Sequence, residues 1–231
     1  MFPDICDWQK GREALSSNGY WELGKILPDD MCDQLAGTYD QEALFRSRIV
    51  MSRYQFGSGE YQYFAYPLPG IVEKLRTHCY EGLQPVANEW SAQLGQSERY
   101  PASLTDYLAL CHAAEQMRPT PLLLKYGAGD YNCLHQDLYG EEYFPIQMAI
   151  CLSEPGRDFD GGEFVLTHQR PRMQSVATVL SPKKGEAIAF AVNTRPVKGA
   201  RGYYQVKMRH GVSPVKRGKR LVLGLILHDA R

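Results

Sequence analysis

A histidine and an aspartate stand two residues apart near the middle of this 231-residue sequence, at the end of the stretch Tyr126-Gly-Ala-Gly-Asp-Tyr-Asn-Cys-Leu-His-Gln-Asp137. A run of strand-forming residues precedes this stretch. Side chains at positions i and i+2 of an extended strand point to the same face, so His135 and Asp137 are predicted to project together. An imidazole and a carboxylate placed in this way form a short chelating pair that needs a third ligand from elsewhere in the chain.

His210 is the candidate for the third ligand, because it ends a segment, 202–210, whose alternate residues are predicted to share one face of a strand. Two histidines and one carboxylate that leave the opposite side of a metal ion open are the usual arrangement in non-haem Fe(II) oxygenases. Arg220, the tenth residue after His210, opens an apolar strand. A buried guanidinium needs an anion, which is either the carboxylate of a ligand or an acidic residue of the chain itself.

The ordered set of His135, Asp137, His210 and Arg220 resembles the Fe(II)/2-oxoglutarate-dependent dioxygenase superfamily. Two intervening segments resemble the strand-turn pattern of that superfamily: 160–164 and 182–190.

Two longer segments, 118–141 and 161–175, are similar to a bacterial oxygenase family whose name describes oxidative action on damaged, methylated DNA. The likeness extends from about Gly19 to Ala230, which is nearly the whole chain. The motifs point to the chemistry of the family more directly than to its substrate.

The resemblance implies that the two histidines and the aspartate hold Fe(II), with 2-oxoglutarate as co-substrate and O2 as oxidant, and that succinate and carbon dioxide are released. It also implies that Arg220 grips the distal carboxylate of 2-oxoglutarate. Tyr126 and Asn132 resemble the residues that hydrogen-bond 2-oxoglutarate in AlkB-type members. Lys125 is a rival candidate for the anchor.

The first half of the chain is predicted to contain both helices and strands. The expected elements are a strand at 19–27, a helix that starts at 28–35, a hairpin within 45–66, and helices at 71–94 and 103–117. Pro85 is expected to kink or interrupt the longer helix, because proline lacks the N–H that the helix needs.

After Pro121 the pattern changes to short strands separated by glycine and proline. The expected strands are 122–126, 134–138, 145–152, 162–167, 175–180, 186–192, 203–210 and 220–228. Eight such strands predict a mainly β fold with some α-helix, a double-stranded β-helix of the jelly-roll, cupin-like type. We expect one oxygenase domain over 1–231, in which a helical and β buttress at 1–118 covers a jelly-roll catalytic core at 119–231.

Composition places the chain among globular proteins, with 44% hydrophobic and 23% charged residues. The six cysteines form no C-x-x-C pair, which favours buried thiols over a disulfide framework. The start of the chain lacks the pattern of a secretory signal, and the longest apolar run, 221–227, is too short to cross a bilayer. These features predict a cytoplasmic protein without membrane contact.

The formal net charge is zero, but 13 of the 26 Lys and Arg residues fall in 165–220, where Glu186 is the only acid. Such a basic region is either a footprint for nucleic acid or a solvated surface balanced by the acidic remainder of the chain. A base in a single strand or a flipped base would need a basic track with stacking aromatic residues. Candidates for that track are Arg170, Arg172, Arg195, Lys198, Arg201, Tyr203, Lys207 and Arg209, with Tyr139 and Tyr143 as stacking candidates in a loop that follows the metal ligands.

Three functions fit these observations. The first is oxidative demethylation of alkylated nucleic-acid bases, which releases formaldehyde. The second is hydroxylation of a prolyl or other protein residue, or of a small molecule, which leaves a stable alcohol. The third is a non-catalytic jelly-roll module with a structural metal, which an open three-ligand face disfavours because structural sites tend to close their coordination.

Overall fold

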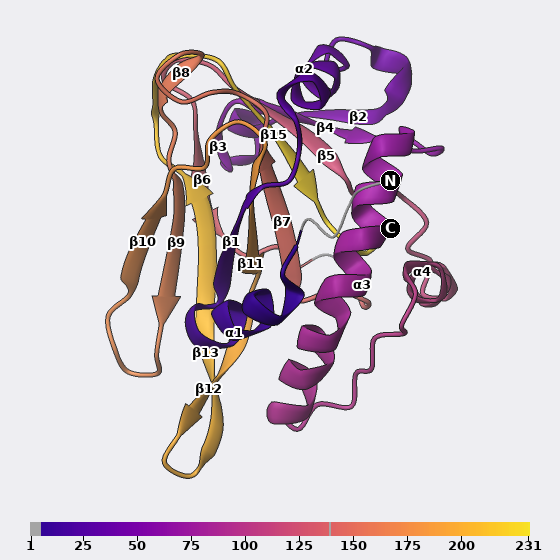
Figure 1. Ribbon diagram of the computed structural model, residues 1–231, viewed down its shortest axis with the longest axis vertical. Coiled ribbons are helices and arrows are strands. Elements are labelled where there is room, and N and C mark those ends of the chain that lie inside the picture. The colour runs from indigo at the N-terminus through magenta and orange to yellow at the C-terminus, as the bar shows by residue number, and fades with distance from the viewer. Residues whose placement is uncertain (1–5, 139) are drawn as a thin grey trace.

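The computed structural model describes residues 6–138 and 140–231 (Figure 1). Antiparallel strands form two large facing sheets. The first is seven-stranded, in the order β1 (Tyr20–Lys25), β11 (Glu186–Ala191), β7 (Ile146–Cys151), β15 (Arg220–Leu225), β5 (Leu122–Tyr126), β4 (Glu60–Phe64) and β2 (Phe45–Val50).

The second sheet is six-stranded and lies on the side of the first that faces away from the long helix in Figure 1. Its order is β10 (Val176–Leu180), β9 (Phe164–Gln169), β13 (Gly202–Val212), β6 (Tyr131–His135) and β3 (Gly57–Ser58), with β12 (Thr194–Gly199) paired to β13. A small pair joins β14 (Val215–Gly218) to β8 (Phe159–Gly161). The predicted mainly β fold, a double-stranded β-helix with added helices, is confirmed.

The first half of the chain contributes strands as well as helices. Its strands β1, β2 and β4 are hydrogen-bonded into the same seven-stranded sheet as strands from the second half. Its helices are α1 (Trp8–Asn18), α2 (Asp29–Gly37), α3 (Gly70–Gln93) and α4 (Leu104–Ala113), with short 3-10 turns at Glu42–Leu44 and Met51–Tyr54. The sequence analysis did not predict α1.

Helix α3 covers the outer face of the seven-stranded sheet (Figure 1). Its buried residues Val72, Leu75 and Leu83 belong to the same core cluster as Ile150 and Leu223 of the sheet. The helix runs through Pro85 without interruption, so of the two expected effects of this proline, kink or interruption, the interruption does not occur. Pro85 and the carbonyl-bearing residue one turn before it, Glu81, are both exposed, so water can satisfy the carbonyl that loses its partner.

The catalytic half differs from the expected strand pattern in one boundary near the metal-ligand candidates and in added short strands, among them β8, β12 and β14. The strand expected at 134–138 is β6, which ends at His135, so Asp137 follows the strand rather than lying within it. The strand β12 was not predicted, because Pro196 and the basic residues around it do not resemble a strand; it is held as one arm of a hairpin with β13. Within the described ranges, no helix combines the length and the apolar character that a membrane crossing requires.

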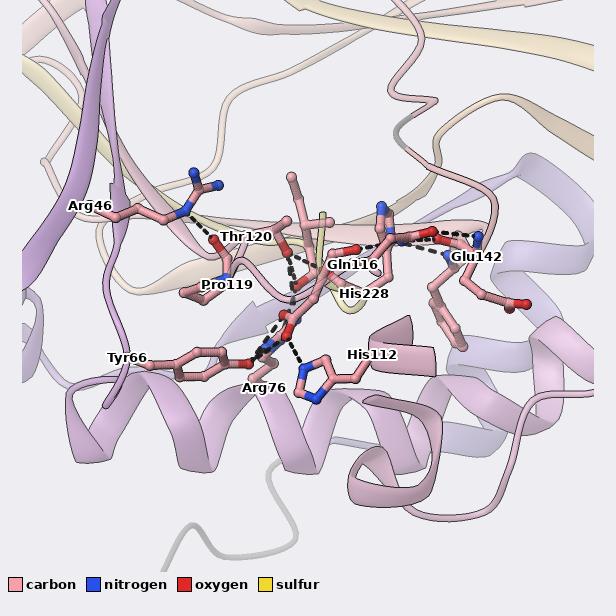
Figure 2. Close-up of polar contacts among 12 residues, drawn as sticks. Arg46, Tyr66, Arg76, His112, Gln116, Pro119, Thr120, Glu142 and His228 are labelled. Atoms are coloured by element: carbon pink, nitrogen blue, oxygen red, sulfur yellow. Dashed lines mark hydrogen bonds and ion pairs between the residues drawn. The ribbon is translucent and has the colours of Figure 1, made fainter. Parts of the chain in front are cut away.

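A buried ion pair joins the end of the chain to α3 (Figure 2). The Arg76 guanidinium donates to the Asp229 carboxylate at 2.8 Å and to the Ile226 carbonyl at 3.2 Å. The same carboxylate accepts from the Tyr66 hydroxyl at 2.8 Å and contacts Nε2 of His112 at 2.9 Å. Because the Arg76 guanidinium and the Asp229 carboxylate are both buried away from water, each charge is stabilised by the other.

His228, next to Asp229, is also fully buried, and its Nδ1 accepts a hydrogen bond from the Phe144 backbone N–H at 3.1 Å. Burial, with a smaller effect from nearby Arg76, lowers the pKa of His228 from its usual 6.5 to about 4. The folded protein therefore holds this imidazole in the neutral form across the neutral and mildly acidic range.

We expect Arg76→Met to lower the free energy of unfolding by about 3–5 kcal/mol, because it leaves the Asp229 carboxylate buried without its cation. Urea denaturation followed by circular dichroism measures the change. Arg12→Met is the control: Arg12 pairs with Glu89 at 2.8 Å in an exposed position, so its loss should cost less than about 1 kcal/mol. Equal losses of unfolding free energy in the two variants would contradict the prediction that the buried pair stabilises the fold more than the exposed pair does.

His228 should make the protein less stable in mild acid. In the unfolded chain this imidazole takes up a proton below its usual pKa, whereas the folded state resists protonation down to about pH 4. The stability that this group contributes, roughly 3 kcal/mol, should therefore be lost as the pH falls from 6.5 to 4. His228→Asn keeps an acceptor for the Phe144 N–H and cannot titrate, so urea denaturation between pH 7.5 and 4.5 should show a smaller loss for it. Parallel losses in both proteins would refute the assignment.

Candidate active site

A short turn carries the chain from one sheet to the facing one. β5 ends at Tyr126, and the Asp130 carboxylate accepts a hydrogen bond from the Gly127 N–H at 2.7 Å, while the Asp130 N–H donates to the Gly127 carbonyl at 3.0 Å. Gly129, with φ of 89°, adopts the left-handed conformation that glycine tolerates best. The turn therefore places Tyr126 and Asn132 on opposite walls of one cavity.

Strand β6 leaves this turn and pairs with β13 so that His135 lies opposite His210. A bulge next to this pair contains Gly211, where a Cβ atom would lie 2.7 Å from the Asn132 carbonyl oxygen. The absence of a side chain at Gly211 thus permits the close approach of the two strands. The two imidazole rings come to 4.2 Å between centroids.

The three predicted metal ligands converge in the structure. Nε2 of His135 lies 3.3 Å from one oxygen of Asp137, and Nε2 of His210 lies 3.3 Å from the other. One ligand atom from each of the three residues lies within 4.8 Å of the others. Nδ1 of His135 is 2.7 Å from the Cys133 carbonyl, which can only accept, so Nδ1 carries the proton and Nε2 has its lone pair free for a metal ion.

The charges at the cluster suit a cation. Burial would raise the pKa of Asp137, but its hydrogen bonds and attraction to the two imidazoles prevail and hold that pKa well below its usual value. Burial lowers the pKa of His210, and Asp137 offsets this only in part. Burial also acts to lower the pKa of His135, but Asp137 prevails and raises it. An ionised carboxylate and a neutral His210 are the forms that bind a metal ion, and at His135 a metal ion competes with a proton.

A cavity of about 410 Å³ lies between the two sheets and contains all three of these side chains. Arg220, Tyr126 and Asn132 line one end of it. Arg220 is opposite Tyr126 in the pairing of β15 with β5, so the strand register brings these two side chains to the same face.

Arg220 has no internal acidic partner. Its side chain is only 3% exposed, and it forms no ion pair with the described residues. The nearby Tyr126 and Phe159 rings have centroids 5.6 and 5.9 Å from the guanidinium carbon. The Tyr126 hydroxyl is buried without a hydrogen-bond partner in the described part of the chain. A buried cation beside an unpaired hydroxyl favours a carboxylate ligand over the internal ion pair that the sequence left open.

Lys125, the rival anchor, is not brought into this cavity. It neighbours Tyr126 on β5, and its side chain consequently points to the other face of the sheet. There its Nζ pairs with Glu60 at 2.7 Å and lies 4.2 Å from the centroid of the Tyr39 ring. Of the two anchor candidates, Arg220 and Lys125, Arg220 is therefore the one whose side chain reaches the cavity.

Of the residues predicted to contact a substrate, those in the described part of the chain do not line the cavity either. Arg209 is exposed on β13, on the opposite face from His210, and Arg170 and Arg172 are exposed in the β9–β10 connection. Tyr143 packs at the edge of a core cluster and does not reach the cavity. Tyr139 lies outside the described residues. Arg195, which the sequence analysis included in a basic track, is buried and donates to the Ser16 carbonyl at 3.0 Å, so it belongs to no exposed surface.

Most of the other residues that line the cavity were not predicted from the sequence. These are aromatic or uncharged and include Tyr61, Tyr63, Gln147, Phe190 and Ile226. Tyr61 and Tyr63 alternate with outward-facing Glu60 and Gln62, but that pattern does not say which face meets the metal ligands. Gln147 gave a clearer signal, because it is the one polar residue in the apolar stretch 145–152.

A protein-family model described as "Oxygenase, catalysing oxidative methylation of damaged DNA" matches residues 59–230 of the chain. Two uncharacterised proteins of Mycobacterium tuberculosis, from strains CDC 1551 and H37Rv, are each 48% identical over 167 residues. That region covers 72% of this chain and 72% of each relative. All metal-ligand candidates and Arg220 fall inside the matched family region.

Solved structures share the fold at low sequence identity. A Pseudomonas putida prolyl-4-hydroxylase has a TM-score of 0.59 and 15% identity, over 97% of this chain and 99% of that one. A Trichoplax adhaerens prolyl hydroxylase, in complex with a peptide fragment of the hypoxia inducible factor oxygen degradation domain, has a TM-score of 0.58 and 14% identity, over 95% of this chain and 88% of that one. At these identities the likeness concerns the fold alone.

We expect Asp137→Asn to weaken binding of a divalent metal ion by at least about 100-fold, because removing a charge beside the ion costs at least about 3 kcal/mol. Calorimetric titration with Mn(II) measures the affinity. Asp130→Asn is a matched control: its carboxylate holds the β5–β6 turn, so metal affinity should be close to that of the wild type. Equal weakening by both changes would mean that the effect passes through the turn and not through a metal ligand.

Proposed function

Since the chain belongs to the oxygenase family whose model matches residues 59–230, we propose that it is an Fe(II)- and 2-oxoglutarate-dependent dioxygenase that demethylates alkylated nucleic-acid bases. The observation that carries the proposal is that one cavity holds His135, Asp137 and His210 together with basic Arg220 and several uncharged aromatic side chains.

The side chains fit the cofactors by their chemistry. Two imidazole nitrogens and one carboxylate match the ligand set of non-haem Fe(II) oxygenases. Arg220 offers a planar fork for a carboxylate, and the unpaired Tyr126 hydroxyl adds a hydrogen bond to it. In this proposal Arg220, Tyr126 and Asn132 bind 2-oxoglutarate, and the three metal ligands bind Fe(II).

When bound, Fe(II), 2-oxoglutarate and O2 supply the oxidation: one oxygen atom enters a C–H bond of the N-methyl group and the other enters succinate, with loss of carbon dioxide. The hydroxymethyl group then leaves as formaldehyde: its C–N bond breaks, its hydroxyl group loses a proton, and the ring nitrogen takes up that proton. The protein's part is to hold the methyl group near the metal ligands and to exclude bulk water. Tyr61, Tyr63 and Phe190 supply apolar surface for a planar base at that point.

A base can reach this cavity only from a single strand or after extrusion from a duplex. The exposed cations Lys207 and Arg209 on β13, together with Arg170 and Arg172, offer an outer surface for backbone phosphates. Protein hydroxylation is the second candidate, and the fold shared with prolyl hydroxylases favours it. It differs in its product, because a C-hydroxylated residue is stable and releases no formaldehyde.

The test is to assay succinate and formaldehyde in the same reaction, with Fe(II), 2-oxoglutarate and O2, in the presence and absence of a methylated single-stranded oligonucleotide. We expect the oligonucleotide to stimulate succinate release, with formaldehyde in matching amount. Succinate that the oligonucleotide does not change would reject nucleic acid as substrate while retaining the oxygenase chemistry. No succinate under any condition would reject both.

Arg220→Ala should raise the dissociation constant of 2-oxoglutarate at least about 30-fold, because losing a buried charge partner costs at least about 2 kcal/mol. Calorimetry on the Mn(II)-loaded protein measures this constant, and Mn(II) affinity itself should hardly change. Lys125→Ala, on the adjacent residue that points away from the cavity, should leave 2-oxoglutarate affinity unaltered. The opposite result would transfer the anchor from Arg220 to Lys125.

A further inference from the structure

The cavity has a second polar group, far from Arg220, that neither the metal nor the co-substrate uses. On the inner face of the seven-stranded sheet, Val222 of β15 pairs with Cys151 of β7, and Gly224 pairs with Ala149. Side chains alternate along β7, so Gln147 lies on the same face as Ala149 and Cys151, and it lines the cavity. In the register of β7 with β15, Gln147 is six residues along the strand direction from Arg220, which corresponds to roughly 20 Å. The three metal-ligand candidates line the same cavity.

Gln147 is held rigidly and is buried. Strand β7 is hydrogen-bonded on both sides, to β11 and to β15, and Gln147 is opposite Phe190 in the pairing with β11. The Phe190 ring packs 4.7 Å from the centroid of the His210 ring, which places Gln147 at the border of the metal cluster. The side chain is only 5% exposed.

The Nε2 atom of Gln147 has no hydrogen-bond partner in the described part of the chain. Two other glutamines of the chain do have a hydrogen-bond partner for Nε2. Gln136, also in the cavity wall, donates from Nε2 to the Met208 carbonyl at 2.9 Å, and Gln62, on the outer face of β4, donates to the Tyr39 carbonyl at 2.7 Å. A buried donor without a partner is costly, and because Gln147 lines the cavity, a ligand bound there can supply the acceptor.

We propose that Nε2 of Gln147 donates a hydrogen bond to a carbonyl oxygen next to the methylated ring nitrogen of the substrate base. The inference rests on the proposed function and adds a preference to it. In 3-methylthymine the N-methyl group lies between two carbonyls, whereas in 1-methyladenine it lies between an amino group and a C–H. A free amide N–H pairs with the first base and has no acceptor beside the methyl group in the second.

The difference in charge between the two bases adds to the preference for 3-methylthymine over 1-methyladenine. 1-Methyladenine carries a positive charge, and its amino group can only donate, so it leaves the Gln147 N–H without an acceptor. The side chains around Gln147, namely Tyr63, Phe190 and Ile226, carry no formal charge to compensate. A site built around a hydrogen bond discriminates strongly against a ligand that cannot make it.

The experiment compares kcat/KM for formaldehyde release from two otherwise identical single-stranded oligonucleotides, one with 3-methylthymine and one with 1-methyladenine. We expect the wild type to prefer 3-methylthymine by at least about tenfold. Gln147→Leu, which removes the donor and nearly keeps the volume, should abolish the preference by slowing 3-methylthymine turnover. Gln147→Glu, which can only accept, should reverse it.

Melting temperatures separate recognition from folding. Gln147→Leu should melt at or above the wild-type temperature, because it removes an unpaired buried amide. Gln62→Leu is the matched control: it breaks a satisfied buried hydrogen bond on the other face of the sheet, so it should melt lower and keep the substrate preference.

The outcomes distinguish the two levels of the proposal. Formaldehyde from neither oligonucleotide would overturn base demethylation and the role of Gln147 with it. Formaldehyde at similar rates from both in the wild type, or an intact preference in Gln147→Leu, would overturn the role of Gln147 alone.

Discussion

The pairing of β6 with β13 is the constraint on which the rest of the site depends. It sets His135 opposite His210 and so holds two imidazoles side by side at the inner face of the six-stranded sheet. Asp137 then reaches both rings from just beyond the end of β6. Because side chains alternate along a strand, a shift of one residue in this pairing would turn a histidine to the solvent face and dismantle the cluster.

The facing sheet supplies Arg220, Tyr126 and Gln147 to the cavity. Its central strands β7 and β15 are paired on both sides, so residues on their inner face have little freedom to move. The inner residues of this sheet include one charged side chain, Arg220, and several uncharged ones, among them the aromatic Tyr63 and Phe190 and the amide of Gln147. The cost of burying Arg220 and Gln147 without internal partners is offset by the large apolar core between this sheet and α3.

The sequence predicted the three residues that converge as candidate metal ligands, the basic residue of the cavity and the fold class, because each leaves a local or ordered signature. Histidine and aspartate two residues apart, a distant histidine and an arginine ten residues later form a pattern that can be read without coordinates. The aromatic wall could not be read in this way. Tyr61 and Tyr63 come from β4, more than sixty positions before the metal ligands, and only the pairing of β4 with β5 brings them to the cavity. The loop aromatics and exposed arginines were chosen for their type, and type alone does not determine which way a side chain points.

Strand β15 is fastened at the end remote from Arg220 by the buried pair of Arg76 and Asp229, and by the Arg76 hydrogen bond to the Ile226 carbonyl. These contacts fix the longitudinal position of the strand. Sliding by two residues would keep Arg220 on the inner face but displace its guanidinium by roughly 7 Å. The ion pair on the helix side therefore helps to set the distance between the Arg220 guanidinium and the three candidate metal ligands, although neither of its residues lines the cavity.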